Sequence, residues 1–316
     1  MTLNTIKFGV MKIFVVKIFN FLRDFCCHFK LGGPVVSLDF IRNKMNSWNL
    51  SDLAEFGDAD NRGTSLSDTP AYVLICKLAS ENDAILNRFK REVNYMRILE
   101  HVDYPLGREY LFQIQNDLRL ITNLKEVASR EIGNPKKYHF PKIGSVSPTQ
   151  LRYTKILGDM TEFFGNLDGF SIAEIGVGNG GQSLHLINMY KIAKYSYFDL
   201  PEVQRLVKRI LEVSSADVHA LFPDIFNLIP GTYDLVIANY SFSELRVSEQ
   251  RDYFANVMLN SKRGYLILNN IKPQGQENIG ALELLGMVPG SEILVEKPLS
   301  HPNNQLFVWG HQTLKK

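Results

Sequence analysis

The chain has few cysteines and little charge of one sign, and each shortage excludes a class of protein. Its 316 residues include three cysteines, two of them adjacent (Cys26 and Cys27), which is no framework for a disulfide-stapled secreted domain. The 35 basic and 33 acidic side chains give a formal net charge of +2, so no strong field favours a nucleic acid partner. With 45% hydrophobic residues, the composition is typical of a globular, cytoplasmic protein with about two structural units.

A long uncharged apolar run is also missing. The most apolar segment, residues 8–29, is interrupted by Lys12, Lys17, Arg23 and Asp24, which disfavours both a membrane-spanning helix and a secretory signal. Its polar and apolar side chains fall largely on opposite sides of a helix. We therefore expect a basic arm over residues 1–50 with a cationic amphipathic helix, lying either on an anionic inner membrane face or against protein, its own domain or a second subunit.

Residues 51–147 predict a helical region ahead of the main domain. Residues 51–70 read as a loop, and apolar side chains then recur at three- and four-residue spacing over 71–101 and about 108–131, separated by DYPLG. The sequence Ser147-Pro148-Thr149-Gln150 predicts a capping box that begins a helix over 148–164.

Short strands alternate with helices from Phe170 to the C-terminus, in the domain expected over 148–316. The predicted strands are 171–175, 194–200, 217–221, 234–239, 264–269, 292–296 and 306–310, and the predicted helices are 182–192, 202–214 and 247–260. This alternation predicts an α/β, Rossmann-like sheet, mostly parallel, with ligands at the carboxyl ends of its strands. Only about nine residues join the last two strands, so these should be antiparallel.

The first of these strands runs into the glycine-rich string AEIGVGNGGQS. Glycines there allow a tight turn and let a ligand approach the N–H groups of the next helix. Their spacing, with Asp199 at the end of the second strand, also satisfies the dinucleotide fingerprint, so an NAD(P)-dependent oxidoreductase is one alternative. Glu174 would repel a pyrophosphate but suits a ligand with amino and sulfonium groups.

SIAEIGVGNGG, YFDLPEV and the reversed last strand resemble a class I S-adenosylmethionine-dependent methyltransferase. The resemblance implies that the glycine loop holds the methionine and ribose parts of the cofactor and that Asp199 binds the ribose hydroxyls. It also implies an adenine contact for Asp224, which equally reads as a turn residue. The expected cofactor-binding residues are Arg152, Tyr153, Glu174, Gly176, Gly178, Gly180, Gly181, Gln182, Asp199, Leu200, Asp224 and Asn239.

Across residues 133–270, the strings SPTQLRYTKILGDM, EIGVGNGGQS, FDLPEV, NYSFSEL and RGYLILNN are similar to sugar O-methyltransferases encoded with bacterial surface-polysaccharide genes. That resemblance implies methylation of a sugar hydroxyl, on a nucleotide-linked or glycan-attached residue. Enzymes that methylate amines resemble one another in an Asn or Asp followed directly by two prolines, and Asn239-Tyr240-Ser241-Phe242 has none. Methylation at pyrimidine C5 needs a cysteine nucleophile, and no cysteine follows Cys76, so amine and pyrimidine C5 acceptors are both disfavoured.

Methyl transfer to a hydroxyl needs a group that removes the proton. Glu244, after the fourth strand, is the first candidate, although it could equally pair with Arg246 or cap a backbone amide, and His301 is the second. His219 is expected to be structural. The candidate acceptor contacts, all polar groups at strand ends, are Tyr240, Ser241, Ser243 and Asn270. The sequence has no zinc-ligand or calcium-loop spacing, and whether a divalent metal ion takes part stays open. A catalytically inactive scaffold is a further alternative.

Overall fold

The structure, a computed structural model, describes residues 69–269 and 277–311. Two units, residues 1–49 and 50–316, are treated separately, and every element named below belongs to the second. The arm predicted for residues 1–50, the loop predicted for 51–70 except its last two residues, and Asn270 lie outside the described residues. Among the residues that are described, no helix is long and apolar enough to cross a membrane.

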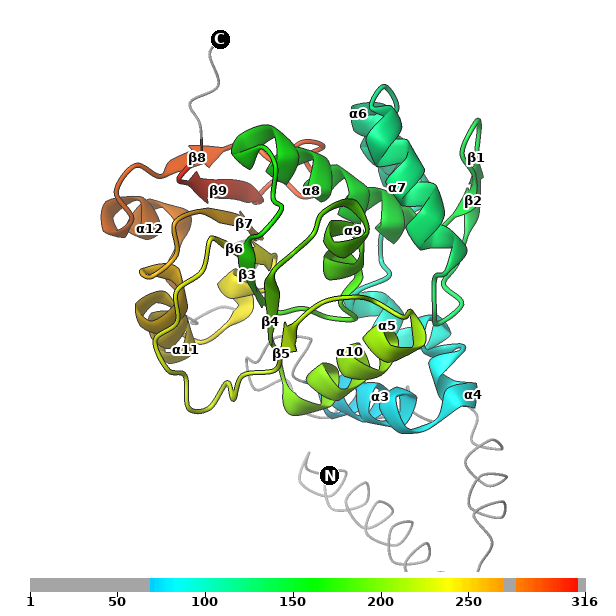
Figure 1. Ribbon diagram of the computed structural model, residues 1–316, viewed down its shortest axis with the longest axis horizontal. Helices are drawn as coiled ribbons and strands as arrows, with labels where there is room; N and C mark the ends of the chain where they lie inside the picture. Colours follow the sequence, from blue (N-terminus) through cyan, green and yellow to red (C-terminus); the bar gives the residue numbers. More distant parts are fainter. Residues whose placement is uncertain (1–68, 270–276, 312–316) are drawn as a thin grey trace, which may run out of the picture. The chain divides into compact units, whose positions relative to one another are not determined.

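A seven-stranded sheet runs through the second unit (Figure 1). Its order is β5-β4-β3-β6-β7-β9-β8. Neighbouring strands from β5 to β7 are parallel, whereas β9 is antiparallel to both β7 and β8. The strands are β3 (Ser171–Ile175), β4 (Lys194–Phe198), β5 (Ala220–Leu221), β6 (Leu235–Asn239), β7 (Gly264–Leu268), β8 (Glu292–Leu294) and β9 (Gln305–Trp309). The predicted Rossmann-like, mostly parallel sheet with a reversed last strand is therefore confirmed.

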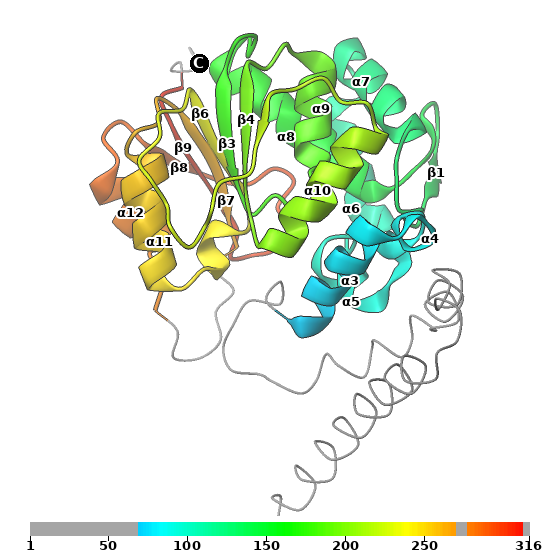
Figure 2. The ribbon, with the colours of Figure 1, turned by 60° about the horizontal axis from the view of Figure 1, so that its bottom comes forward.

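Helices cover both faces of the sheet, which explains why its central strands are almost wholly apolar. On one face lie α8 (Pro148–Phe164), α9 (Gly181–Met189) and α10 (Pro201–Val213), which pack against side chains such as Ile172 and Ile237. On the other face lie α11 (Val247–Tyr253), the π-helical turn η5 (Phe254–Met258) and α12 (Ala281–Met287) (Figure 2). The predicted helices 182–192, 202–214 and 247–260 correspond to α9, α10 and α11 with η5.

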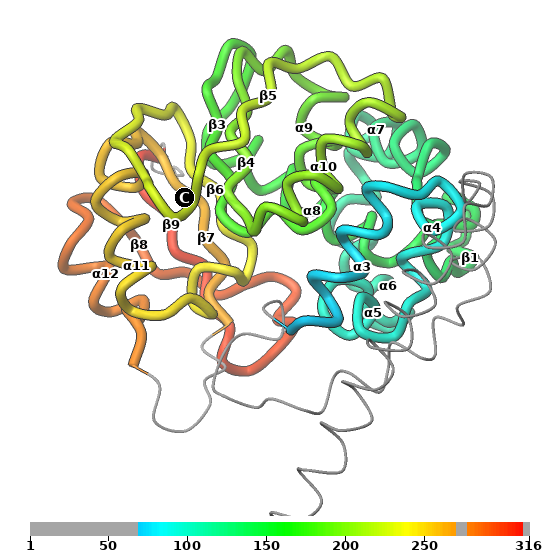
Figure 3. The backbone as a smooth tube through the Cα atoms, turned by 90° about the horizontal axis from the view of Figure 1, so that it is seen from below, coloured from blue at the N-terminus to red at the C-terminus, as the bar shows by residue number. Residues whose placement is uncertain are grey.

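A further helical layer packs on the outside of α8, α9 and α10 (Figure 3). Its elements are α3 (Pro70–Glu81), α4 (Asp83–Leu86), η3 (Phe89–Arg91), α5 (Val93–Ile98), α6 (Tyr104–Ile114) and α7 (Leu118–Ser129). One hydrophobic core runs without interruption from Tyr72 in α3 to Val308 in β9. The described part of the region predicted for 51–147 is thus a layer built onto the sheet domain, sharing its core.

The helices of this layer begin and end at other residues than the sequence predicted. The helical pattern over 71–101 is not one helix, because the side chain of Asn82 accepts hydrogen bonds from the N–H groups of Ala84 and Ile85 and begins a new helix there. The next helix begins before the predicted residue 108, within the segment DYPLG. Asp103 accepts a hydrogen bond from the Leu106 N–H at 2.9 Å, so α6 begins at Tyr104.

The start of α8 is predicted correctly, but its predicted capping box is wrong. Ser147 Oγ and Gln150 Nε2 both donate hydrogen bonds to Glu131 Oε1, at 3.0 and 2.8 Å, and Ser147 makes no side-chain capping bond. A buried carboxylate from a distant part of the sequence therefore replaces the local partners. The short hairpin of β1 (Tyr138–Phe140) and β2 (Gly144–Val146) was also not predicted.

Candidate active site

The loops that follow β3, β4, β6 and β7 meet at the carboxyl edge of the sheet, as expected for parallel strands. In the glycine loop after β3, Gly176 and Gly180 have φ angles of 74° and 72°, which favour glycine. A Cβ on Gly176 would collide with the side chain of Ser241, and one on Gly181 would collide with the ring of Tyr153. The predicted glycines are therefore required by the packing around the loop.

Asp199 fastens the glycine loop to the end of β4. Its Oδ2 accepts a hydrogen bond from the Gly178 N–H at 3.0 Å, and its Oδ1 accepts one from the Leu200 N–H at 2.7 Å. Leu200 then leads into α10. An ionised carboxylate has about four lone-pair sites, so this side chain can also accept hydrogen bonds from a ligand.

Arg152 on α8 is a buried cation, 5% exposed. Its guanidinium lies 5.7 Å from the ring centroid of Tyr153 and 5.5 Å from that of Tyr240, and its Nη2 donates a hydrogen bond to the Leu99 carbonyl at 3.2 Å. None of the ion pairs within the described ranges includes Arg152. Burying a cation without an anion is costly, so this position is suited to a ligand carboxylate.

His101 lies beside Arg152, with its Nε2 3.5 Å from the guanidinium Nη1. Loss of solvation, the main cause, and the positive charge of Arg152 together lower the pKa of His101 to about 4. The imidazole is therefore neutral near pH 7. Its Nδ1 lies 3.0 Å from the Ile98 carbonyl, and if that nitrogen carries the proton, Nε2 can accept from Arg152.

Two amide side chains at this edge have polar atoms without partners. Both the oxygen and the nitrogen of the Asn239 amide, at the end of β6, are buried and make no hydrogen bond within the part of the chain that the structure describes. Gln182 Nε2 donates to the Tyr153 carbonyl at 3.2 Å, but its Oε1 has no partner there either. Each such group costs about 1–3 kcal/mol when buried, and a polar ligand would recover that cost.

Glu174 is not the anion that was expected from the sequence. The side chain is 2% exposed, and its Oε2 accepts a hydrogen bond from the Tyr195 hydroxyl at 2.7 Å. Burial, the main cause, and the charge of Asp199 together raise the pKa of Glu174 to about 8, although the Tyr195 hydrogen bond acts in the opposite direction. The carboxyl group is therefore mostly protonated near pH 7, and a cation brought close to it would favour its ionised form.

The candidate acceptor contacts follow β6. Tyr240 has a φ of 70°, uncommon for a residue other than glycine, and its hydroxyl donates to Glu296 Oε1 at 2.5 Å. Ser241 Oγ donates to the Ile175 carbonyl. Ser243 Oγ donates to Asn269 Oδ1 at 2.6 Å and accepts from the Asn269 N–H at 3.0 Å. The two serines thus tie this loop to β3 and to the end of β7.

The two predicted bases have different surroundings. Glu244, in the turn η4 (Phe242–Glu244), is partly exposed, and its Oε1 accepts a hydrogen bond from Asn269 Nδ2 at 2.6 Å. This amide partner differs from the Arg246 or backbone partners considered from the sequence. His301 is exposed in the connection between β8 and β9, where its Nδ1 accepts from the Asn303 N–H.

Asp224 and His219 lie on the surface. Asp224 accepts hydrogen bonds from the Phe226 N–H at 2.9 Å and from Asn227 Nδ2 at 2.7 Å, which is the turn role left open by the sequence. His219 is exposed, so it does not belong to the core. No group of three or more His, Cys, Asp or Glu side chains able to hold a metal ion occurs within residues 69–269 and 277–311.

Of three comparisons with known proteins, only the one with solved structures gave matches. No protein-family model matches the chain, and comparison with curated proteins gave no match. Among solved structures, the chain is similar to an rRNA methylase from Streptococcus thermophilus, with 14% identity, coverage of 52% of this chain and 96% of the other, and a TM-score of 0.36. It is also similar to the magnesium protoporphyrin IX methyltransferase from Synechocystis, with 15% identity, coverage of 48% and 78%, and a TM-score of 0.36. These similarities carry no information about substrate.

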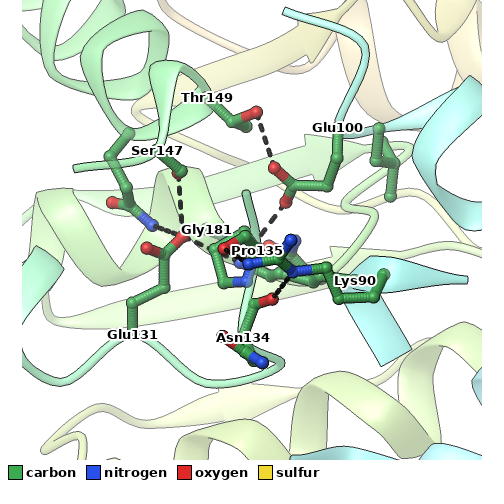
Figure 4. Close-up of polar contacts among 12 residues, drawn as sticks. Lys90, Glu100, Glu131, Asn134, Pro135, Ser147, Thr149 and Gly181 are labelled. Carbon is green, nitrogen blue, oxygen red and sulfur yellow. Dashed lines mark hydrogen bonds and ion pairs between the residues drawn. The ribbon is translucent and has the colours of Figure 1, made fainter. Parts of the chain in front are cut away.

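A buried ionic cluster lies beside the start of α8 (Figure 4). Lys90 Nζ lies 3.4 Å from Glu100 Oε1 and 3.2 Å from Glu131 Oε1, and Thr149 Oγ1 donates to Glu100 Oε2 at 2.8 Å. Burial raises the pKa of Glu100. The cluster joins the outer helical layer to the helix that carries Arg152. It could not be predicted from the sequence, because its members lie far apart in the chain.

A cavity of about 620 Å³ lies elsewhere, between α7, α9 and the end of α10. Among its lining residues are Val127, Leu184 and Ile210, and of the described residues predicted for the site only Gly181 lines it. Arg152, Asp199 and Asn239 do not. The cavity and the polar groups at the carboxyl edge of the sheet are therefore different features, and the candidate active site is the latter.

Proposed function

We propose that this protein is an S-adenosylmethionine-dependent O-methyltransferase that acts on a sugar hydroxyl. The observation that carries the proposal is the buried Arg152 without an ion-pair partner in the described structure, next to the unpartnered amide of Asn239 and the glycine loop. A ligand with a carboxylate, an amino group and a ribose would satisfy these groups together, whereas a pyrophosphate would not supply the amino group.

The residues fit that cofactor in a definite way. Arg152 would hold the carboxylate through charge-assisted hydrogen bonds, the amides of Asn239 and Gln182 would accept and donate at the amino-acid end, and Asp199 would accept from the ribose hydroxyls. Backbone N–H groups of the glycine loop would complete the cradle. When bound, the cofactor would supply a methyl group on a positively charged sulfur, and the protein would align the acceptor hydroxyl and take its proton.

Three observations support oxygen as the acceptor atom and a sugar as its carrier. Asn239 is followed by Tyr240 and Ser241, whereas the corresponding motif of amine-methylating enzymes has two prolines after this position. Carboxylate and hydroxyl side chains, which suit recognition of a polyol, follow β6. The motifs over 133–270 resemble sugar O-methyltransferases of surface-polysaccharide gene clusters. The proposed substrate is a nucleotide-linked or glycan-attached sugar in the cytoplasm, with the basic segment 8–29 as a contact to an anionic membrane.

Equilibrium dialysis with S-adenosylhomocysteine and with NAD tests the cofactor. We expect S-adenosylhomocysteine to bind and NAD not to bind. Arg152→Ala and Asp199→Ala should each weaken the binding of S-adenosylhomocysteine at least about tenfold, because each removes charge-assisted hydrogen bonds of about 1.5–3 kcal/mol. Asp117→Ala is a matched control, since that exposed carboxylate also accepts backbone hydrogen bonds, but at the start of α7. Binding of NAD alone would instead favour an oxidoreductase.

The acceptor is tested by incubating the protein with methyl-labelled cofactor and a panel of nucleotide sugars and envelope glycans. We expect label in an ether linkage on one sugar. Cofactor binding without transfer to any member of the panel would favour the non-catalytic scaffold.

A further inference from the structure

We propose that Tyr240 takes the proton of the acceptor hydroxyl and passes its own proton to Glu296. This inference rests on the proposed function, and it assigns the base for that reaction to a pair of residues joined by one hydrogen bond. Neither Glu244 nor His301, the two bases predicted from the sequence, belongs to this pair.

Tyr240 lies where the reaction needs a base. It is the residue directly after Asn239 at the end of β6, and the guanidinium of Arg152, the proposed holder of the cofactor carboxylate, lies 5.5 Å from its ring centroid. Its left-handed backbone, with φ 70°, is the kind of strained conformation found at functional sites. The side chain is only partly exposed, so a proton on its oxygen is sheltered from bulk water.

Glu296 is a buried carboxylate held entirely by neutral donors. The side chain is 3% exposed. Its Oε1 accepts from the Tyr240 hydroxyl at 2.5 Å, and its Oε2 accepts from the Ser300 N–H at 3.0 Å and from Asn304 Nδ2 at 2.8 Å. No ion pair within the described ranges includes Glu296. Ser300 Oγ also donates to this carboxylate, at 2.9 Å from Oε2 and 3.1 Å from Oε1. Of the two hydroxyl groups bonded to Glu296, that of Tyr240 makes the shorter hydrogen bond.

The other ionisable groups around the pair come from three elements. Arg152 approaches from α8, Tyr110 from α6 and Tyr265 from β7. Burial, the main cause, raises the pKa of Tyr240 well above its usual value, and the charge of Glu296 contributes in the same direction. The phenol is therefore protonated before the reaction. It can take the acceptor proton only if its own proton passes to the Glu296 carboxylate.

The proton balance is simple. The O–H bond of the acceptor breaks and its proton moves to the Tyr240 oxygen, while the Tyr240 O–H bond breaks and that proton moves to Glu296 Oε1. The electron pair of the acceptor O–H bond stays on the acceptor oxygen. The cofactor supplies the methyl group that this oxygen receives, and the pair of the broken carbon–sulfur bond stays on sulfur. As the new bond forms, the acceptor proton becomes strongly acidic, so a neutral phenol suffices to take it.

Activity is measured with the nucleotide sugar or glycan that the wild-type chain methylates in the labelled-cofactor panel. We expect Tyr240→Phe and Glu296→Gln each to lower kcat about 100-fold or more, with binding of S-adenosylhomocysteine unchanged within about twofold. Glu296→Asp should restore part of the rate, and the acid limb of the pH profile should disappear in Glu296→Gln. Tyr190→Phe is the matched control. The Tyr190 hydroxyl also makes a hydrogen bond, to Thr161 at 2.9 Å, but Tyr190 follows the C-terminal end of α9, whereas the glycine loop precedes the start of that helix.

A second measurement needs no cofactor. In protein with isotope-labelled tyrosine, the NMR signal of Tyr240, assigned by its absence in Tyr240→Phe, should titrate at lower pH in Glu296→Gln, since the neighbouring carboxylate charge is gone. Full activity of Tyr240→Phe, especially with loss of activity in Glu244→Gln, overturns the inference, as does an unchanged Tyr240 titration. If the proposed function itself fails, the wild-type chain methylates nothing while the Tyr240 signal still responds, and the inference falls with it.

Discussion

Replacing Glu174 with Gln should make the protein more stable at alkaline pH. Burial holds the pKa of this carboxyl at about 8, against a value of 4.5 for an exposed Glu. Between those two values the folded chain keeps a proton that the unfolded chain has lost. The free energy of unfolding therefore falls as pH rises, because the stabilisation is complete below about pH 4.5 and is lost through about pH 8.

The size of the effect follows from the same two values. Their difference, at about 1.4 kcal/mol for each unit of pKa, corresponds to about 5 kcal/mol between the two ends of the range. Between about pH 6 and pH 8 the loss should be about 2 kcal/mol, a substantial part of a typical stability of about 5–15 kcal/mol. Gln cannot ionise, so the variant should not lose this contribution.

Urea unfolding followed by circular dichroism at several pH values measures this difference directly. Glu126→Gln serves as the control, because Glu126 is exposed and should leave the wild-type pH dependence unchanged. The measurement is best kept above pH 6.5, where the buried His185 is neutral in both the folded and the unfolded chain. The reasoning is refuted if wild type and Glu174→Gln lose the same free energy of unfolding over this range.

Three further predictions concern the surroundings of the site. Burial and the nearby Lys90 charge lower the pKa of His185 to about 3, so its contribution to stability is present above about pH 6.5 and lost as pH falls toward 3; His185→Gln should flatten acid unfolding, and an unchanged acid midpoint would contradict this. Lys90→Met should lower the free energy of unfolding by about 3–5 kcal/mol, because it leaves two buried carboxylates unpaired. The control Lys262→Met, at an exposed ion pair, should lower it by at most about 1 kcal/mol in urea unfolding. Equal losses in the two variants would contradict a stabilising role for the buried cluster. Gly181→Ala should weaken cofactor binding and lower Tm, because its Cβ collides with the Tyr153 ring; the change is checked by calorimetry, and wild-type affinity would show that the ring moves aside.

The strand pattern was predictable because it rests on local information. Every predicted strand is found, since apolar runs bounded by glycine and turn residues reflect burial on both faces of a sheet. The glycine loop was predictable for a similar reason, as its positive φ angles restrict the residue type. The breaks in the helical layer were missed because single polar side chains, such as Asn82, end one helix and begin the next.

The candidate base shows where local information stops. Glu296 is fifty-six positions from Tyr240 in the chain, and no spacing rule connects the two, yet the structure places their oxygens 2.5 Å apart. His301, a more conspicuous residue in the same connection, is exposed instead. The chemical type of His301 suggested catalysis, whereas nothing in the sequence pointed to Glu296, and only packing distinguishes the two.

The sequence by itself determined the α/β sheet, the direction of its last strand and the position of the glycine loop, because hydrophobic period and glycine placement act over a few neighbouring residues. Tertiary structure alone decided the protonation of Glu174, the lack of an ion-pair partner for Arg152 among the described residues, and the pairing of Tyr240 with Glu296. Those properties depend on burial and on groups brought together from distant parts of the chain, and electrostatic energies change most where water is excluded.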